Sequence, residues 1–141
     1  MYEAHQYFDG DGSSNYAMTY AQQGAYAMIG ADEVQPFLAW LMENNVKGFV
    51  GEFGIPGNDP LWLPVLDNFL TSIQSAGVPG TYWMYQYHLP TDPFWWPDYE
   101  PLSIRTDNGQ PNPQLPILAG LVSRRGGDNA NLACARSLSS I

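Results

Sequence analysis

The stretch Lys47-Gly48-Phe49-Val50-Gly51-Glu52-Phe53-Gly54 is the part of the sequence that best indicates the fold. A short apolar run closed by glycines is typical of a buried strand in a parallel sheet. Its carboxylate, Glu52, is costly to bury unless a hydrogen bond or a reaction requires it there. The neighbouring glycines leave room for a substrate to come close. Glu52 is therefore a candidate functional residue, and the plain alternative is a glutamate paired with a basic side chain at the strand mouth.

A helix is predicted on each side of this strand. Before it, residues 32–45 place apolar side chains at helical spacing, with Asp32 as the N-cap and Gln35 as its capping-box partner. After it, Asp59 and Pro60 indicate an N-cap followed by proline at the first helical position, and Gly77 is expected to end the helix.

Two further strands and a last helix complete the pattern. Residues 2–8 predict a strand, followed by a long loop to about residue 31, and loops of that length are usually functional. Residues 80–87 predict a third strand with Trp83, Tyr85 and Tyr87 on one side. Residues 112–122 predict a helix, and the tail 123–141 is expected to be poorly ordered. This alternation predicts an α/β fold of right-handed parallel units, with its chemistry at the carboxyl ends of the strands.

Composition excludes several classes of partner. With 141 residues, 45% of them apolar, the chain would by length alone be one domain with a sizeable core. A net charge of −9 makes nucleic acid a poor partner. One cysteine and two histidines argue against a disulfide framework or a structural metal, and no cofactor is expected. No apolar run approaches a membrane span, and the first residues lack the features of a signal peptide.

Other candidate residues lie near the ends of the first and third strands. His5 and Tyr7 are two apart, so their side chains point to one face, although a satisfied, partly buried histidine is the simpler interpretation of this pair alone. Trp83 would be a core aromatic by default. Trp95 and Trp96 fall in a loop, where large aromatics usually mark binding, and their ring faces suit the C–H faces of sugars. The alternative for this pair is a lid packed onto the third strand.

Taken together, three motifs resemble glycoside hydrolase family 5, the cellulase family of retaining (β/α)8 barrels. Residues 2–13, with His5-Gln6-Tyr7 and the following Asp-Gly-Ser loop, are similar to the sixth-strand motif of that family. Gly51-Glu52-Phe53-Gly54 looks like the seventh-strand motif, whose glutamate is the nucleophile. Tyr82-Trp83 looks like the eighth-strand motif, whose tryptophan floors the sugar site. Three motifs in the correct order, within a similarity that runs to about residue 121, are much more specific than any one of them.

The resemblance implies both a fold and a reaction. Residues 1–122 would be the C-terminal three βα units, strands six to eight, of a TIM barrel that is incomplete in this chain. The reaction would be double displacement on a β-1,4-glucan, with Glu52 attacking the anomeric carbon and Tyr7 hydrogen-bonding Glu52 to hold its attacking oxygen. His5 would line the same site, and Trp83 would stack under the sugar. In retaining enzymes a second carboxyl group, about 5 to 5.5 Å away, protonates the leaving oxygen.

The sequence departs from the family pattern at this general acid. In the family it is the glutamate of an Asn-Glu pair on the fourth strand, and no Asn-Glu pair occurs among these residues. We therefore expect the chain alone to be inactive and to need the N-terminal part of the barrel as a partner. The full enzyme would be secreted, because polymeric glucan does not enter cells. Two alternatives stay open: a non-catalytic carbohydrate-binding fragment, and a family member acting on mannan, xyloglucan or another β-glucan.

Overall fold

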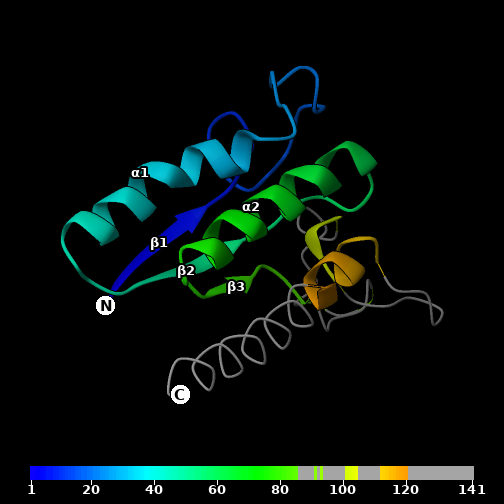
Figure 1. Cartoon of the computed structure of the whole chain (residues 1–141). Helices are drawn as coiled ribbons and strands as arrows, with labels where there is room; N and C mark the ends of the chain where they lie inside the picture. Colours follow the sequence, from blue (N-terminus) through cyan, green and yellow to red (C-terminus); the bar gives the residue numbers. More distant parts are fainter. Residues whose placement is uncertain (86–90, 92, 94–100, 105–111, 121–141) are drawn as a thin grey trace, which may run out of the picture.

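The computed structural model describes residues 1–85, 91, 93, 101–104 and 112–120 of the chain. Its elements follow the order β1 (Tyr2–Gln6), α1 (Ile29–Glu43), β2 (Gly48–Phe53), the short 3-10 helix η1 (Pro60–Trp62), α2 (Leu63–Ser75) and β3 (Gly80–Tyr82). Residues 114–120 are also helical. The strands form a parallel sheet in the order β1-β2-β3, and α1 and α2 pack against each other along it (Figure 1). The predicted alternation of strands and helices in a parallel α/β fold is confirmed.

An apolar core lies between the sheet and the two helices. Aromatic rings lie at its centre. The ring centroid of Phe69 in α2 is 5.1 Å from that of Phe8 and 5.0 Å from that of Phe53. Such tilted contacts add to the burial of apolar area that drives folding. The buried members of this cluster are Phe8, Val34, Leu38, Leu41, Val50, Phe53, Ile55, Trp62, Val65, Leu66, Phe69, Leu70, Ile73 and Val78.

Both helices end in the same way. After α2, Gly77 adopts a φ of +68° and donates to the Gln74 carbonyl, while the Val78 N–H donates to the Ile73 carbonyl. This is a Schellman motif, and it confirms Gly77 as the stop signal. α1 ends with the same pair of hydrogen bonds, with Asn45 in the left-handed position at a φ of +51°.

The predicted helix starts are corrected at two places. α1 begins at Ile29, and its N-cap, Met28, makes no side-chain cap hydrogen bond. Asp32 lies within the first turn, where its carboxylate accepts from the Tyr26 hydroxyl over 2.9 Å, so the predicted N-cap was wrong. Packing explains the earlier start: a Cβ on Gly30 would lie 2.8 Å from the Phe8 ring, so this turn is pressed onto the core. Asp59 does act as a cap, but for η1, which leads into α2.

The outer strands are shorter than predicted. β1 ends at Gln6 and β3 at Tyr82, so residues 83–85 do not continue the strand that was predicted over residues 80–87. Tyr85 is 61% exposed, whereas Met84 is buried. The Trp83 N–H still donates to the Phe53 carbonyl over 2.7 Å, after which the chain leaves the ladder. The predicted tail, residues 123–141, lies outside the described residues, as does Tyr87. None of the described helices is long and apolar enough to span a membrane.

β2 carries one extra residue relative to both of its neighbours. The paired residues at this point are Ala4 with Val50, His5 with Glu52, Val50 with Gly80, and Phe53 with Tyr82. Gly51 is therefore the inserted residue of a β-bulge. Because side chains alternate between faces with a period of two, the insertion reverses the phase of the strand. Val50 and Phe53, three residues apart, both enter the core, and Glu52 shares the face of His5.

Candidate active site

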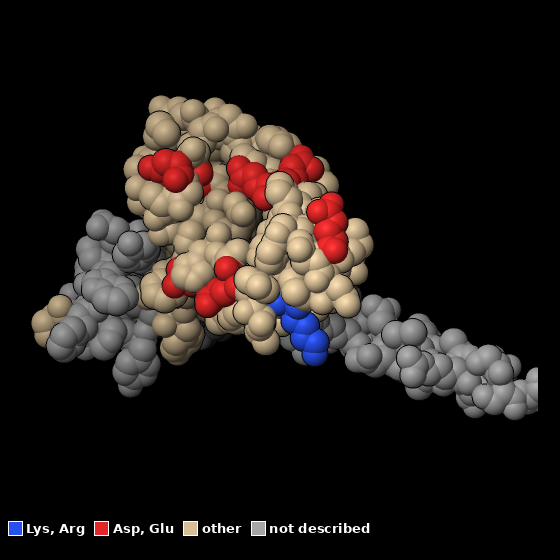
Figure 2. Space-filling view, turned by 90° about the vertical axis from the view of Figure 1, so that its left-hand side faces the viewer, with Lys and Arg blue, Asp and Glu red and all other residues tan. Residues whose placement is uncertain are grey.

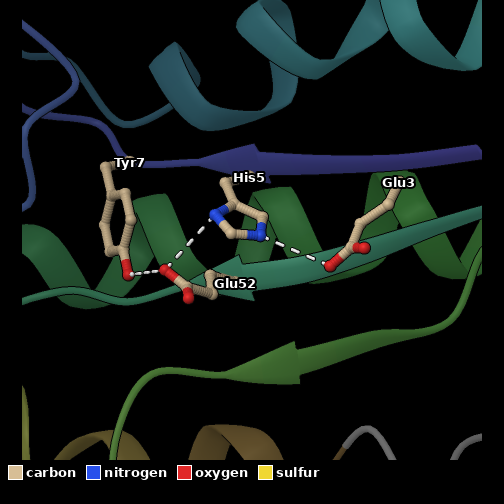
Figure 3. Close-up of polar contacts among 4 residues, drawn as sticks. All are labelled: Glu3, His5, Tyr7 and Glu52. Carbon is tan, nitrogen blue, oxygen red and sulfur yellow. Dashed lines mark hydrogen bonds and ion pairs between the residues drawn. The ribbon is translucent and has the colours of Figure 1, made fainter.

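Three of the predicted site residues meet at one carboxylate oxygen (Figure 3). The Tyr7 hydroxyl donates to Oε2 of Glu52 over 3.0 Å. His5 Nδ1 lies 3.4 Å from the same oxygen. His5 belongs to β1, Tyr7 follows that strand directly, and Glu52 comes from β2 just after the bulge. The phase reversal at Gly51 is what brings Glu52 to the other two, because without it Glu52 would face the helices.

The site combines partly exposed side chains, which a ligand can reach, with a buried tyrosine that supports them. The side chain of Glu52 is 33% exposed and that of His5 is 51% exposed, whereas Tyr7 is buried. The plain alternative for Glu52 was a basic side chain at the strand mouth, and the imidazole of His5 is such a neighbour. In the part of the chain that the structure describes, its partners are a phenol and an imidazole.

Glu3 is a fourth member of the site. Its Oε1 lies 3.3 Å from His5 Nε2, so the imidazole is placed between two carboxylates, Glu3 and Glu52 (Figure 3). Glu3 is not among the site residues predicted from the sequence. The signal was the spacing of two residues between Glu3 and His5 on one strand.

The glycines around Glu52 make room for protein atoms, which corrects the expectation that they make room for substrate. A Cβ on Gly51 would lie 1.9 Å from Oε1 of Glu3, so the Glu3 carboxylate occupies that notch. A Cβ on Gly54 would lie 2.1 Å from the Trp83 carbonyl oxygen. Both glycines are therefore needed where neighbouring groups approach closely.

Two partly buried tyrosines, Tyr16 and Tyr82, connect the end of β2 to its surroundings. The Tyr16 oxygen accepts from the Phe8 N–H over 3.1 Å, and its hydroxyl donates to the Gly54 carbonyl over 2.6 Å. The Tyr82 hydroxyl donates to the Ile55 carbonyl over 3.0 Å. Burial raises the pKa of both phenols well above the ordinary tyrosine value. Both phenols therefore keep the protons with which they hold the strand ends at neutral pH.

The long loop after β1 is built around Asp9. This buried carboxylate accepts from the Ser13 hydroxyl and from the N–H groups of Ser14 and Tyr16, over 3.0 to 3.3 Å. Hydrogen bonds from Ser13 also hold the pKa of the exposed Asp11 below its usual value. The loop consists of turns and bends up to residue 28 and contains no short helix. The turns position Tyr16, and through it the end of β2.

Of the three predicted tryptophans, one lies within the described residues and two lie outside them. Trp83 is half-buried at the carboxyl edge of the sheet, directly after β3. Trp95 and Trp96 lie outside the described residues. No group of three or more His, Cys, Asp or Glu side chains within the described ranges could hold a metal ion.

Comparisons with known proteins give a consistent family. The model of the cellulase family, glycosyl hydrolase family 5, matches residues 1–89. Endo-beta-1,4-glucanase B of Emericella nidulans is 29% identical over 99 residues, which are 70% of this chain and 27% of that protein.

Solved structures agree with this match. The crystal structure of Pseudomonas stutzeri endoglucanase Cel5A in complex with cellobiose superposes with a TM-score of 0.70 and 35% identity, over 84% of this chain and 33% of that chain. A triple mutant of an endo-beta-1,4-glucanase from Xanthomonas axonopodis pv. citri gives a TM-score of 0.70 and 31% identity, over 86% of this chain and 36% of its own. The chain thus spans about a third of the length of these solved relatives and about a quarter of the curated one.

The family match covers more than half of the chain, and it includes β1, the bulged β2 with Glu52, and β3. The chain therefore belongs to the cellulase family, glycosyl hydrolase family 5.

Proposed function

We propose that these residues form the nucleophile side of the active site of a retaining endo-β-1,4-glucanase. The observation that supports this most directly is the meeting of Tyr7 and His5 at one oxygen of Glu52, at the carboxyl edge of a parallel sheet. Nucleophilic residues of parallel α/β enzymes are found at this edge. Glu52 forms the glycosyl-enzyme bond, and water later cleaves it.

The two contacts on Oε2 give Glu52 a defined orientation. A carboxylate that accepts from a phenol and faces an imidazole cannot rotate freely about its terminal bond, so its second oxygen points in a fixed direction. A nucleophile that is already held in an attack geometry loses less entropy on reaching the transition state, and this lowers the activation free energy. Tyr7 and His5 are therefore the residues that keep Glu52 aimed at the anomeric carbon.

The general acid is proposed to come from residues outside this sequence. β1, β2 and β3 would be strands six, seven and eight of the barrel, and the acid would stand on the fourth strand. The absence of an Asn-Glu pair supports this assignment, as does the one-third coverage of the solved relatives. Because the substrate is a polymer, we propose that the complete enzyme acts outside the cell.

The surface favours a neutral ligand over an anionic one. Acidic side chains are spread over the face shown in Figure 2, with basic atoms in one small area. Such a face repels polyanions but does not repel an uncharged glucan. Cellobiose, the ligand named for the Pseudomonas stutzeri structure, is an uncharged β-1,4-linked disaccharide. We propose that Trp83, and also Trp95 and Trp96, contact the sugars through their ring faces.

Covalent labelling tests the proposal without a general acid. A 2,4-dinitrophenyl 2-deoxy-2-fluoro-β-cellobioside carries a leaving group that departs without protonation, and its fluorine slows hydrolysis of the glycosyl-enzyme. The Glu52 oxygen forms a bond to C1 as the bond from C1 to dinitrophenolate breaks. The chain is incubated with the reagent alone and together with the N-terminal two thirds of the Pseudomonas stutzeri relative. We expect the mass of one fluorocellobiosyl group on the peptide that contains Glu52.

Two variants control this experiment. Glu52→Gln should abolish the label, and Glu43→Gln, which removes an equal charge from the exposed end of α1, should keep it. Glucan hydrolysis by the mixture that survives Glu52→Gln would refute the nucleophile assignment. The non-catalytic carbohydrate-binding alternative would be favoured if the chain binds cellopentaose but is not labelled, either alone or together with the N-terminal part of the relative.

A further inference from the structure

We infer that Glu3 is a positioning residue of this site, and that its carboxylate holds the His5 ring so that Nδ1 faces Glu52. The catalytic meaning of this inference rests on the proposed function, but the contact itself can be tested separately. Three features of the structure carry it: the distance from Glu3 to His5, the exposure of the imidazole, and the notch at Gly51.

The exposure of His5 means that packing does not fix its ring. Its side chain is 51% exposed, so the imidazole could turn about its side-chain bonds at small cost. Each of its two nitrogens faces a carboxylate, with Nδ1 3.4 Å from Glu52 and Nε2 3.3 Å from Glu3. Removing either carboxylate leaves one anchor, about which the ring can swing.

The bulge gives the Glu3 carboxylate a defined place. Glu3 is 60% exposed, and an exposed side chain of this length would ordinarily sample many rotamers. Here Oε1 lies over the backbone of Gly51, at a point 1.9 Å from where a Cβ would be. The residue whose insertion turns Glu52 toward His5 is thus also the residue whose missing side chain admits Glu3.

The two carboxylates compete for the proton of a neutral imidazole. A neutral ring has one N–H and can donate to Glu3 or to Glu52, whereas a doubly protonated ring donates to both. Glu3 therefore sets which nitrogen carries the proton as well as the direction of the ring. Without Glu3, the neutral ring should place its proton on Nδ1 and donate to Glu52.

Nitrogen NMR of the imidazole tests this directly on the whole chain. The sequence has only one other histidine, His88, so a His88→Gln background leaves a single imidazole to observe. The spectra are recorded at about pH 9, above the ordinary imidazole pKa of about 6.5, where the two neutral tautomers are distinguished by their nitrogen shifts. We expect Glu3→Ala to raise the ratio of Nδ1–H to Nε2–H tautomer by about 1.5-fold to fivefold, the range typical of an exposed charged contact.

Two further variants separate positioning from simple loss of charge. Gly51→Ala keeps the charge of Glu3 but displaces its carboxylate, so it should shift the ratio in the same direction. Glu43→Ala makes the same truncation on an exposed part of α1 and should leave the ratio unchanged. Far-UV circular dichroism confirms that each variant is folded. An unchanged ratio in both Glu3→Ala and Gly51→Ala would overturn the inference.

The labelling assay then connects the contact to the reaction. In the mixture that labels Glu52, Glu3→Ala should slow labelling at saturating reagent by about 1.5-fold to fivefold and leave the half-saturating concentration unchanged. A shifted tautomer ratio without any labelling of the unmodified chain would refute the proposed function and leave the Glu3 contact standing. Labelling at an unchanged rate in Glu3→Ala would refute its role in positioning.

Discussion

Gly54→Ala is predicted to destabilise the chain much more than Gly51→Ala, although both replacements add one methyl group next to Glu52. The new Cβ at position 54 would lie 2.1 Å from the Trp83 carbonyl oxygen, and that oxygen belongs to the backbone. The new Cβ at position 51 would meet the far end of the exposed Glu3 side chain, which can swing away. Neither glycine has a positive φ, so backbone strain does not distinguish them.

The magnitudes follow from what must move. At position 54 the two backbones must separate by about 1 Å, which corresponds to overpacking of about 1–3 kcal/mol. The 2.7 Å hydrogen bond from the Trp83 N–H to the Phe53 carbonyl is stretched as well, at about 0.5–1.5 kcal/mol. Against these stands a gain of about 0.4–1 kcal/mol from the stiffer unfolded chain. We expect a net loss of about 0.5–4 kcal/mol for Gly54→Ala.

At position 51 the terms nearly cancel. The contact between Glu3 and His5 is exposed, and its loss costs about 0.2–1 kcal/mol, which the stiffer unfolded chain offsets. Urea unfolding of both variants and the parent chain, followed by far-UV circular dichroism, measures the difference. Equal destabilisation by the two replacements, or a Gly54→Ala variant within 0.5 kcal/mol of the parent, would refute the reasoning about which neighbouring group can move.

Two predictions concern pH. Because the folded pKa values of Tyr16 and Tyr82 are raised above those of the unfolded chain, stability should be fully present below about pH 10 and fall at higher pH. In an absorbance titration at 295 nm, at least two of the nine tyrosines should ionise only as the circular dichroism signal is lost, and full ionisation of a folded chain would contradict this. Burial and the charge of Asp9 raise the pKa of Glu33, so its contribution to stability is present below the unfolded pKa and lost as pH rises through the folded pKa. Urea midpoints between about pH 3 and pH 7 should therefore decline less in Glu33→Gln than in the parent, and parallel curves would contradict the prediction.

Much of the architecture could be predicted because local signals and packing agree. The apolar run closed by glycines predicted β2, and Gly77 predicted the end of α2. In the structure Gly77 adopts a φ of +68°, which a glycine tolerates well. The N-cap predicted at Asp32 was wrong for a physical reason. Asp32 has a good N-cap side chain, but Gly30 and the turn around it pack against Phe8, and the helix therefore begins earlier. Tertiary contacts of this kind leave no mark on local propensity.

The candidate site was predictable in its members more than in its geometry. The spacing of His5 and Tyr7 indicated one face, and the motif around Glu52 indicated a functional carboxylate. A period of two, however, puts Glu52 on the same face as Val50, which is buried in the core. Only the register with β1 and β3 shows that Gly51 is an inserted residue. The spacing of Glu3 and His5 on one strand put them on one face, but the notch at Gly51 that receives the Glu3 carboxylate depends on that same insertion.

The bulge at Gly51 also bears on how this strand can change during evolution. Apolar residues before the inserted glycine must fit the core under the helices, whereas Glu52 must fit the site on the other face. Substitutions in the two halves of the strand can therefore be selected separately. Deleting Gly51 would remove the bulge and leave Val50 and Glu52 as neighbours on opposite faces of a regular strand, but it would also remove the notch that receives the Glu3 carboxylate. The inserted glycine should therefore be retained for the place it gives the Glu3 carboxylate more than for the side of the sheet on which Glu52 lies.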